Sequence, residues 1–365
     1  MSTIDTVIVG AGQAGLAVGY HLAHQGRDFT ILDAAAEPAA AWRQRWDSLT
    51  LFTPARYDSL PGLPFPGDPA HYPTRDEVVG YLSGYVERFD LPVELGRRVS
   101  RVAPAGDGWL VETAEGAITA RNVVIATGAF QVPRVPAGLA AGLDPAVQQL
   151  HSAAYQRPAA VAGQSVLVVG GGNTGYQIAE ELALDGRDVH LAIGTEHPPM
   201  PTHVLGRETF AILDRIGAMR RTADTRIGRW FKDRDTLVGY SPKAARRMGI
   251  ALRDRAVATD GTNVRFADGA SATPDAVVWA TGYTRDHSFV EAPVFAGGDV
   301  VQRRGVTDAP GLYFIGLPWM HTRGSALLGW VGHDAEHVAT HIATRTVIPP
   351  RGILPPATTP LKGLA

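Results

Sequence analysis

Two glycine-rich hexapeptides are the residues of this chain whose spacing most clearly predicts chemistry. The first runs from Gly10 to Gly15 and the second from Gly170 to Gly175, and both fit the pattern GxGxxG. In this pattern the first glycine allows a tight turn, the second lets the backbone approach a pyrophosphate, and the third lets a helix pack on a strand. Each hexapeptide therefore predicts a phosphate cradle at a helix N-terminus, where unpaired N–H groups favour an anion.

The residue expected after the second strand differs between the two cradles. Asp33 stands 23 residues after the first glycine and suits a hydrogen bond to a ribose diol. The same position 160 residues later is Ile193. A carboxylate there would repel a ribose 2′-phosphate, so its absence favours NADP, with Arg207 or Arg187 as counter-charge. The alternative is that the strand ends later, at Thr195, and that the comparison with Ile193 does not apply.

The residues around each hexapeptide have the pattern of a strand, a helix and a second strand. An offset of 160 residues is too long for a solenoid repeat and predicts two domains of related design. The expected elements are Thr6–Val9, Gln13–Gln25 and Asp28–Leu32, and then Ser165–Val169, Asn173–Asp185 and Asp188–Ile193.

Other segments predict the elements that complete the first domain. Thr74 to Glu77 has capping-box spacing and opens a helix expected to reach Val86. The final segment, Gly311–Ile342, reads as a strand, a turn at Pro318 and a long helix that begins at Arg323, with no sheet of its own to join. Short strands are expected at Arg97–Ala103, Trp109–Thr113, Ala117–Ala120 and Val123–Ala126.

We therefore predict an α/β fold with two Rossmann-like dinucleotide-binding domains, the second inserted into the first. The first domain is expected to comprise residues 1–135 and 286–365, and the second domain, for which NADPH is favoured, residues 155–283. The expected linkers are residues 136–154 and 284–290.

Composition excludes several classes of protein. Lys and Arg number 34 against 36 for Asp and Glu, so no overall field favours nucleic acid or an anionic membrane. With 0 cysteines there is no disulfide framework, thiolate metal site or redox-active CxxC pair, and we predict no metal centre and no disulfide reductase. We expect a cytoplasmic protein, since the N-terminus has no signal-peptide pattern and no apolar run reaches roughly 18 residues. The oligomeric state is not predicted.

Four further segments carry a family resemblance. Trp42–Leu51 and Leu60–Pro66 resemble a flavin-contacting loop, and Ala126–Gly128 and Ala280–Tyr283 resemble a pair of hinges. With the two cradles, the chain resembles the class B flavin-dependent monooxygenases, meaning the flavin-containing, Baeyer-Villiger and YUCCA-like enzymes. Within them it is most similar to a bacterial subgroup of arsenical-oxidising or cation-efflux-associated flavoproteins. The resemblance implies that the first domain, residues 1–135 and 286–365, is an FAD-binding domain and that the second binds NADPH. It also implies molecular oxygen and a small-molecule substrate oxygenated through a flavin-peroxide.

The chain departs from this family in two places. The family fingerprint FxGxxxH asks for Phe and Gly, but Pro145 and Val147 stand there ahead of His151. Phe52 stands where other members often carry an Asn near the flavin ring. These departures leave fold and cofactors better supported than oxygenation.

The candidate site residues follow from the motifs and the resemblance. Hydride transfer needs few side chains, because the flavin accepts the electrons and the protein supplies orientation and electrostatics. The candidates for chemistry, in an apolar wall or above the flavin, are Phe52, His321 and Arg323. The candidates for cofactor binding are Gly10, Gly12, Gln13, Ala14, Gly15, Asp33, Trp42, Arg43, Thr53, Val99, Ala126, Thr127, Gly128, Gly170, Gly172, Asn173, Thr174, Gly175, Arg207, Ala280, Thr281, Gly282, Gly316, Ser325, Ala326 and Leu327.

Three functions remain open at this point. The first is an FAD- and NADPH-dependent monooxygenase. The second is an NADPH-dependent reductase or oxidase that passes electrons to a quinone, a metal ion or a partner protein. The third is a flavin-binding sensor or scaffold without turnover.

Overall fold

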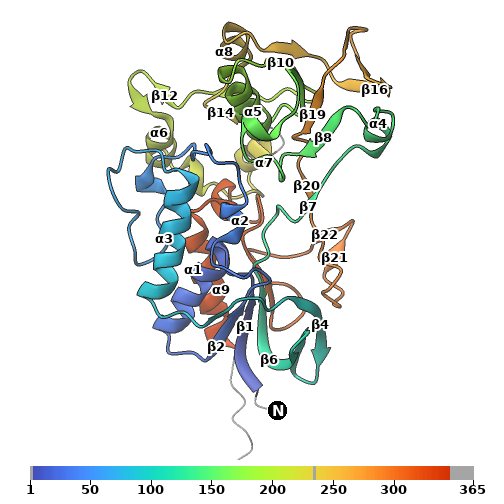
Figure 1. The fold of residues 1–365 in the computed structure, drawn as a ribbon. Coiled ribbons are helices and arrows are strands. Elements are labelled where there is room, and N and C mark those ends of the chain that lie inside the picture. The colour runs from blue at the N-terminus through green and yellow to red at the C-terminus, as the bar shows by residue number, and fades with distance from the viewer. Residues whose placement is uncertain (1–2, 233–235, 346–365) are drawn as a thin grey trace, which may run out of the picture.

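The computed structural model describes residues 3–232 and 236–345. It has two lobes, one above the other in Figure 1, and each lobe is built around its own sheet. Residues 346–365, which the sequence analysis assigns to the first domain, lie outside the described residues.

The sheet of the first lobe has the order β3-β2-β1-β6-β5-β4, and β23 also pairs with β6. Strands β3, β2, β1, β6 and β23 run parallel, whereas β4 and β5 pair antiparallel. The last strand before the C-terminal helix thus returns to the first sheet after the chain has built the second lobe. The bounds are β1 Thr3–Val9, β2 Phe29–Leu32, β3 Val93–Glu94, β4 Val99–Ala105, β5 Gly108–Thr113, β6 Gly116–Ile125 and β23 Leu312–Phe314.

Strand β6 corrects one expectation, because it is a single strand where the sequence pattern predicts two. Its first half pairs with β5 and its second half with β23, while β1 runs along most of its length. At the expected break, the side chain of Asn122 is buried and donates to the carbonyl oxygen of Asp5 over 3.0 Å. The strand continues through Asn122 because the neighbouring strand β1 accepts a hydrogen bond from its side-chain N–H group.

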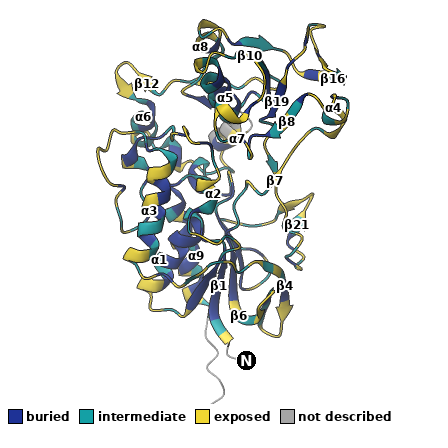
Figure 2. Cartoon of the chain, viewed as in Figure 1, coloured by how far each residue is buried: buried dark blue, intermediate teal, exposed yellow. Residues whose placement is uncertain are grey.

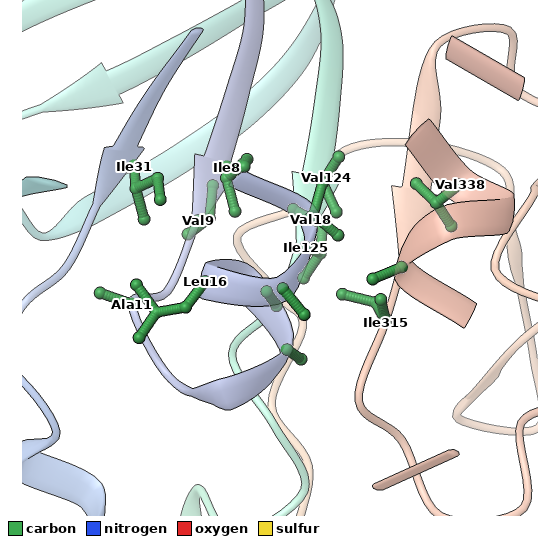
Figure 3. Close-up of a cluster of buried hydrophobic side chains, with 14 of the residues drawn as sticks. Ile8, Val9, Ala11, Leu16, Val18, Ile31, Val124, Ile125, Ile315 and Val338 are labelled. Atoms are coloured by element: carbon green, nitrogen blue, oxygen red, sulfur yellow. The ribbon is translucent and has the colours of Figure 1, made fainter. Parts of the chain in front are cut away.

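The helices of the first lobe cover its sheet. Helices α1 (Gln13–His24) and α9 (Val331–Thr344) pack on the buried strands, and Figure 3 shows Leu16 of α1 and Val338 of α9 facing this apolar core. Helix α3 (Arg75–Arg88) is half buried: it has buried residues, and Figure 2 shows exposed residues, in yellow, along the same helix. The predicted capping box of α3 is confirmed, since Thr74 accepts the Glu77 N–H and the Glu77 carboxylate accepts the Thr74 N–H. Two short elements follow β2, α2 Ala40–Arg43 and η1 Ala55–Tyr57.

The start of the last helix is a second correction. Residues Arg323–Ala326 form a separate 3-10 turn, η4, and α9 begins only at Val331. The reason is that Leu327 has extended backbone angles, φ −86° and ψ 144°, which no helix can pass through.

The sheet of the second lobe has the order β15-β10-β9-β19-β8 and is parallel throughout. Helix α5 (Asn173–Leu184) connects β9 to β10, as the sequence pattern predicts. Strand β8 lies within residues 136–154, where the sequence analysis expects a linker, so part of that stretch is built into the second sheet. The bounds are β8 Gln148–His151, β9 Ser165–Val169, β10 Asp188–Ala192, β15 Ala251–Arg253 and β19 Ala276–Trp279.

Smaller elements surround the second sheet. They are α4 Ala137–Ala141, η2 Pro158–Ala160, β11 Pro199–Met200, β12 His203–Val204, β13 Arg207–Glu208, α6 Thr209–Arg215, η3 Ala218–Arg220, α7 Arg226–Lys232, β14 Leu237–Val238, α8 Pro242–Arg247, β16 Ala256–Asp260, β17 Asn263–Phe266 and β18 Ser271–Ala272. Two further strands, β21 Phe295–Ala296 and β22 Asp299–Val300, pair antiparallel and pack against the core of the first lobe.

Two short strands carry the chain between the lobes. Strand β7 (Val132–Pro133) leaves the first lobe, β20 (Tyr283–Thr284) returns from the second, and they pair antiparallel between the lobes in Figure 1. None of the helices in the described part of the chain is long and apolar enough to cross a membrane.

Candidate dinucleotide sites

The first cradle has one open glycine and two enclosed ones. Gly10 has a φ of +108°, and a Cβ on it would lie 2.7 Å from the carbonyl oxygen of Ala126. A Cβ on Gly15 would lie 2.0 Å from the carbonyl oxygen of Gly10, whereas a Cβ on Gly12 would meet nothing within 4 Å. The turn is therefore closed by the backbone of Ala126 at Gly10 and by its own backbone at Gly15, and it is open at Gly12, where a pyrophosphate would approach.

The second cradle has the same arrangement. Gly170 has a φ of +136°, and a Cβ on it would lie 2.2 Å from the carbonyl oxygen of Ala280. A Cβ on Gly175 would lie 1.9 Å from the Gly170 oxygen, and a Cβ on Gly172 would meet nothing within 4 Å. Each open glycine begins a 12-residue helix, α1 or α5, so the residues present fit a bound pyrophosphate at both places.

Asp33 lies directly after β2 at the edge of the first cradle. Its carboxylate accepts the backbone N–H groups of Ala11, at 2.6 Å, and Ala35, at 2.8 Å. The N–H of Arg97 donates to the Asp33 carbonyl oxygen over 2.7 Å, which brings the segment before Val99 beside it. The carboxylate is held rigidly at the place where a ribose diol would bind.

Ile193 occupies the equivalent position in the second cradle. It follows directly after β10, as Asp33 follows β2, so the alternative of a strand that continues to Thr195 does not hold. A Cβ on Gly171 would lie 2.8 Å from Cγ2 of Ile193, and Gly171 corresponds to Ala11. An apolar contact thus replaces the hydrogen bond from Ala11 to Asp33.

The two arginines expected near this position lie elsewhere. Arg187 precedes β10 and pairs with Asp185 at 3.1 Å. It is therefore at the amino end of the strand, about 16 Å from the carboxyl end, and the suggestion of Arg187 is wrong. Arg207 is exposed in the hairpin of β12 and β13, which stands apart from β10 in Figure 1.

Three distant segments meet at the start of α1. The indole N–H of Trp42 donates to Oε1 of Gln13 over 2.9 Å, and Nε2 of Gln13 donates to the carbonyl oxygen of Ala326 over 3.2 Å. Gly316 lies close enough that a Cβ on it would stand 2.8 Å from Cβ of Ala14. Five of the predicted cofactor contacts, Gln13, Ala14, Trp42, Gly316 and Ala326, are thus brought together beside the first cradle.

Two other predicted cofactor contacts, Arg43 and Thr53, pair with residues a few positions away in the chain. Arg43 pairs with Glu37 at 2.9 Å on the surface. Thr53 is buried and donates its hydroxyl to Oδ1 of Asp58 over 2.6 Å.

Asp58 is a buried carboxyl that the sequence analysis misses. It is 1% exposed, and its Oδ2 has no hydrogen-bond partner among the described residues. Burial raises the pKa of Asp58 to about 7, although the hydrogen bond from Thr53 lowers it. No sequence motif marks this position, because burial of a loop carboxyl depends on the tertiary packing.

The predicted hinges connect each cradle to the strands between the lobes. The backbone N–H of Ala126 donates to the carbonyl oxygen of Val9 over 2.8 Å, and the backbone N–H of Ala280 donates to that of Val169 over 2.9 Å.

Within the first hinge, the side-chain amide of Gln131 donates to the Thr127 hydroxyl over 2.9 Å and also to the Gly128 carbonyl oxygen. In the second hinge, Arg134 donates to the Thr281 carbonyl, and His151 Nε2 lies 3.0 Å from the Gly282 carbonyl oxygen.

An aromatic cluster joins the two lobes near Phe52. The ring of Phe52 stacks on Phe210 of α6 with centroids 6.0 Å apart, and Phe210 lies 6.1 Å from Trp330. Trp330 stacks on Tyr57 at 5.7 Å. Phe210 and Tyr57 are absent from the predicted site, because single aromatic residues in a sequence usually indicate a core.

Arg323 lies beside this cluster, and His321 comes two residues before it in the chain. The carbonyl oxygen of His321 accepts the N–H of Ala223 over 2.7 Å, and burial lowers the pKa of the imidazole. Arg323 donates to the Thr236 hydroxyl and lines a cavity of about 10 Å³ with Met219, which belongs to the aromatic cluster.

The remaining predicted cofactor contacts make hydrogen bonds within the protein or are half-buried in it. The Ser325 hydroxyl accepts the N–H groups of His321 and Thr322, at 3.1 and 3.0 Å, and Leu327 is half-buried just after it. The amide of Asn173 exchanges two hydrogen bonds with the backbone of Val238. Thr174 lies half-buried in the first turn of α5.

The fold matches solved structures of flavin enzymes. A flavin-containing monooxygenase from Stenotrophomonas maltophilia superimposes with a TM-score of 0.78 and 32% identity, over 94% of this chain and 99% of that one. The predicted fold class is confirmed, since the class B flavin monooxygenases have two Rossmann dinucleotide-binding domains. This similarity defines the class of protein.

Sequence comparisons define the family. The model described as pyridine nucleotide-disulphide oxidoreductase matches residues 7–204, more than half of the chain. A CzcO-like oxidoreductase of Geobacillus kaustophilus is 38% identical over 93% of this chain and 98% of its own. The indole-3-pyruvate monooxygenase YUCCA1 of Oryza sativa is 29% identical over 92% of this chain and 90% of its own.

The chain belongs to the pyridine nucleotide-disulphide oxidoreductase family, and the predicted family resemblance is confirmed. It is a flavin-dependent oxidoreductase of the flavin monooxygenase group. Because it contains 0 cysteines, it has no thiol of its own to exchange with a disulfide.

Proposed function

We propose that this protein is an FAD- and NADPH-dependent monooxygenase that oxygenates a small, largely apolar molecule. The observation that carries the proposal is the matched pair of cradles, each open at its second glycine and each in contact with a hinge residue through its first. The names of two relatives, the Stenotrophomonas monooxygenase and the rice YUCCA1 monooxygenase, support oxygenation.

In this proposal the first cradle holds FAD and the second holds NADPH. When bound, the two cofactors supply hydride transfer and the reduction of oxygen. Gln13, placed by Trp42 and Ala326, orients the flavin, and Asp33 binds its ribose. The two hinges set the distance between the cradles, because each is bonded to the strand that precedes its cradle.

The aromatic cluster has the composition needed to exclude water. Phe52, Phe210 and Trp330 present apolar surface from both lobes, and an apolar, dry site protects oxygen chemistry from hydrolysis. His321 comes two residues before Arg323, and burial lowers the pKa of its imidazole, so the ring is neutral at pH 7 and able to accept a proton.

Two departures from the family favour the second function, a reductase or oxidase without oxygenation. Pro145 and Val147 stand where the family fingerprint has Phe and Gly, and Phe52 stands where other members often carry an Asn near the flavin ring. In that case Phe52 and Phe210 close the site, and electrons leave to an external acceptor.

Labelled oxygen distinguishes the two functions. The FAD-loaded protein is supplied with NADPH, ¹⁸O₂ and a panel of small thioethers, amines and ketones, and products are analysed by mass spectrometry. Label in a product supports the monooxygenase. Stoichiometric hydrogen peroxide with every compound, and no labelled product, would reject it in favour of the reductase or oxidase.

A further inference from the structure

An arginine lies at the place in the second cradle that corresponds to the ribose end of the first. Gly194 follows Ile193, and its carbonyl oxygen accepts a hydrogen bond from Nη2 of Arg255 at 2.6 Å. A Cβ on Gly194 would lie 3.5 Å from Nε of Arg255. The guanidinium thus lies against the backbone one residue beyond the position equivalent to Asp33.

The sheet register explains why a residue 61 positions later arrives here. Strands β10 and β15 are parallel and adjacent, with Ala192 opposite Arg253. The N–H of Ile193 donates to the Arg253 carbonyl oxygen over 2.9 Å, so the pairing continues past both strand ends. The same offset places Gly194 opposite Arg255, at the carboxyl edge where a dinucleotide binds.

The guanidinium of Arg255 has donors to spare. It is exposed, and the bond to Gly194 uses one of its five N–H groups. Within the described part of the chain no ion pair joins Arg255 to a carboxylate. The loop after β10 also carries a carboxylate, Glu196, two residues beyond Gly194.

We propose that Arg255 selects NADPH over NADH by binding the 2′-phosphate of the adenosine ribose. The proposal rests on the proposed function, in which the second cradle holds a nicotinamide dinucleotide. A guanidinium binds phosphate through two parallel charge-assisted hydrogen bonds. NADH gains nothing comparable, because Ile193 offers no carboxylate for its 2′-hydroxyl.

Equilibrium binding of two fragments tests this without turnover. The FAD-loaded protein is titrated by calorimetry with 2′,5′-ADP, which carries the 2′-phosphate, and with 5′-AMP, which does not. The wild type should bind 2′,5′-ADP roughly tenfold or more tightly than 5′-AMP. Arg255→Ala should remove that preference and leave the 5′-AMP affinity unchanged, and Arg255→Lys should retain part of it.

A matched control is available in the same lobe. Arg265 is an exposed arginine of β17, and Arg265→Ala should keep the full preference. The role of Arg255 would be overturned if Arg255→Ala still bound 2′,5′-ADP more tightly than 5′-AMP, or if it lost affinity for both fragments equally. Either result would leave the proposed function standing. Failure of the wild type to bind either fragment would overturn both.

Discussion

Trp42 donates its indole N–H to the side-chain oxygen of Gln13 over 2.9 Å, and this bond joins the loop after β2 to the first turn of α1. The side-chain nitrogen of Gln13 also donates to the carbonyl oxygen of Ala326, a residue that precedes the last helix. One amide therefore links three segments that are distant in the sequence and that all border the first cradle.

Gln13→Leu should weaken FAD binding, because it removes both hydrogen bonds while keeping the size of the side chain. Each bond contributes on the order of 1 kcal/mol, so the loss should be about tenfold or more in affinity. Fluorescence titration of the FAD-free protein with FAD measures the effect. Gln25→Leu, at the exposed C-terminal cap of α1, is the control. Equal affinities for the two variants would show that the Gln13 network does not position the flavin.

Substitution of either open glycine by valine should abolish the binding of one cofactor and leave the binding of the other. Gly12 and Gly172 have φ near −80° and extended ψ, which any residue adopts, and a Cβ there meets nothing within 4 Å. Gly12→Val should therefore fold normally and lose FAD, and Gly172→Val should keep FAD and lose NADPH. Thermal unfolding of the ligand-free proteins and titration with each cofactor check this.

Alanine at the enclosed glycine of the first cradle is the contrasting case. Gly15→Ala would place a Cβ 2.0 Å from a backbone oxygen, so it should lower the melting temperature even without ligand. A Gly12→Val variant with the same loss of stability, or with unchanged FAD affinity, would contradict the assignment of the cradle.

Asp58 should make stability fall as pH rises. Its folded-state pKa is about 7, above the unfolded value of 3.8, so the folded protein holds a proton that the unfolded chain releases. Stability is full below pH 4 and is lost as pH rises through 7, by up to about 4 kcal/mol for a shift of this size. Asp58→Asn should flatten this dependence and be more stable than the wild type at pH 8.

Urea unfolding of the FAD-saturated proteins at pH 5, 6, 7 and 8 measures that difference. Asp275 is a suitable control, because backbone hydrogen bonds lower rather than raise the pKa of its carboxyl. Asp275→Asn should leave the slope between pH 5 and 8 unchanged. Parallel curves for the wild type and Asp58→Asn would exclude Asp58 as the titrating group.

Phe52→Ala should uncouple NADPH oxidation from oxygenation. The ring stacks on Phe210 at 6.0 Å, and its removal opens the aromatic cluster to water. We expect a severalfold larger share of the electrons to appear as hydrogen peroxide, with flavin reduction unchanged. Phe130→Ala is the control, since Phe130 is 65% exposed. Peroxide yields that match in the two variants would remove Phe52 from the site.

Much of the fold follows from local patterns in the sequence. The two cradles lie between strand and helix as predicted, because glycine spacing and β-branched runs act over a few residues. The equivalence of Asp33 and Ile193 also follows, since both come directly after a strand. Local signals fail where tertiary pairing decides, as at Asn122 in β6 and at Leu327 before α9.

Contacts between segments that are distant in the chain are the part of the structure that local sequence patterns do not predict. Arg255 reaches Gly194 through the register of β15 on β10, and no motif encodes that register. Phe210 reaches Phe52 only because α6 of the second lobe packs on the first. Asp58 becomes a titrating group only through burial. Such residues are found when the coordinates place distant segments together.

The most direct test of the account is anaerobic rapid mixing of the FAD-loaded protein with NADPH, followed by the visible absorbance of the flavin. The account predicts rapid bleaching in the wild type, and none in Gly172→Val although that variant still carries FAD. A flavin that stays oxidised in the wild type, or that bleaches equally fast in Gly172→Val, would contradict electron transfer from the second cradle to the first.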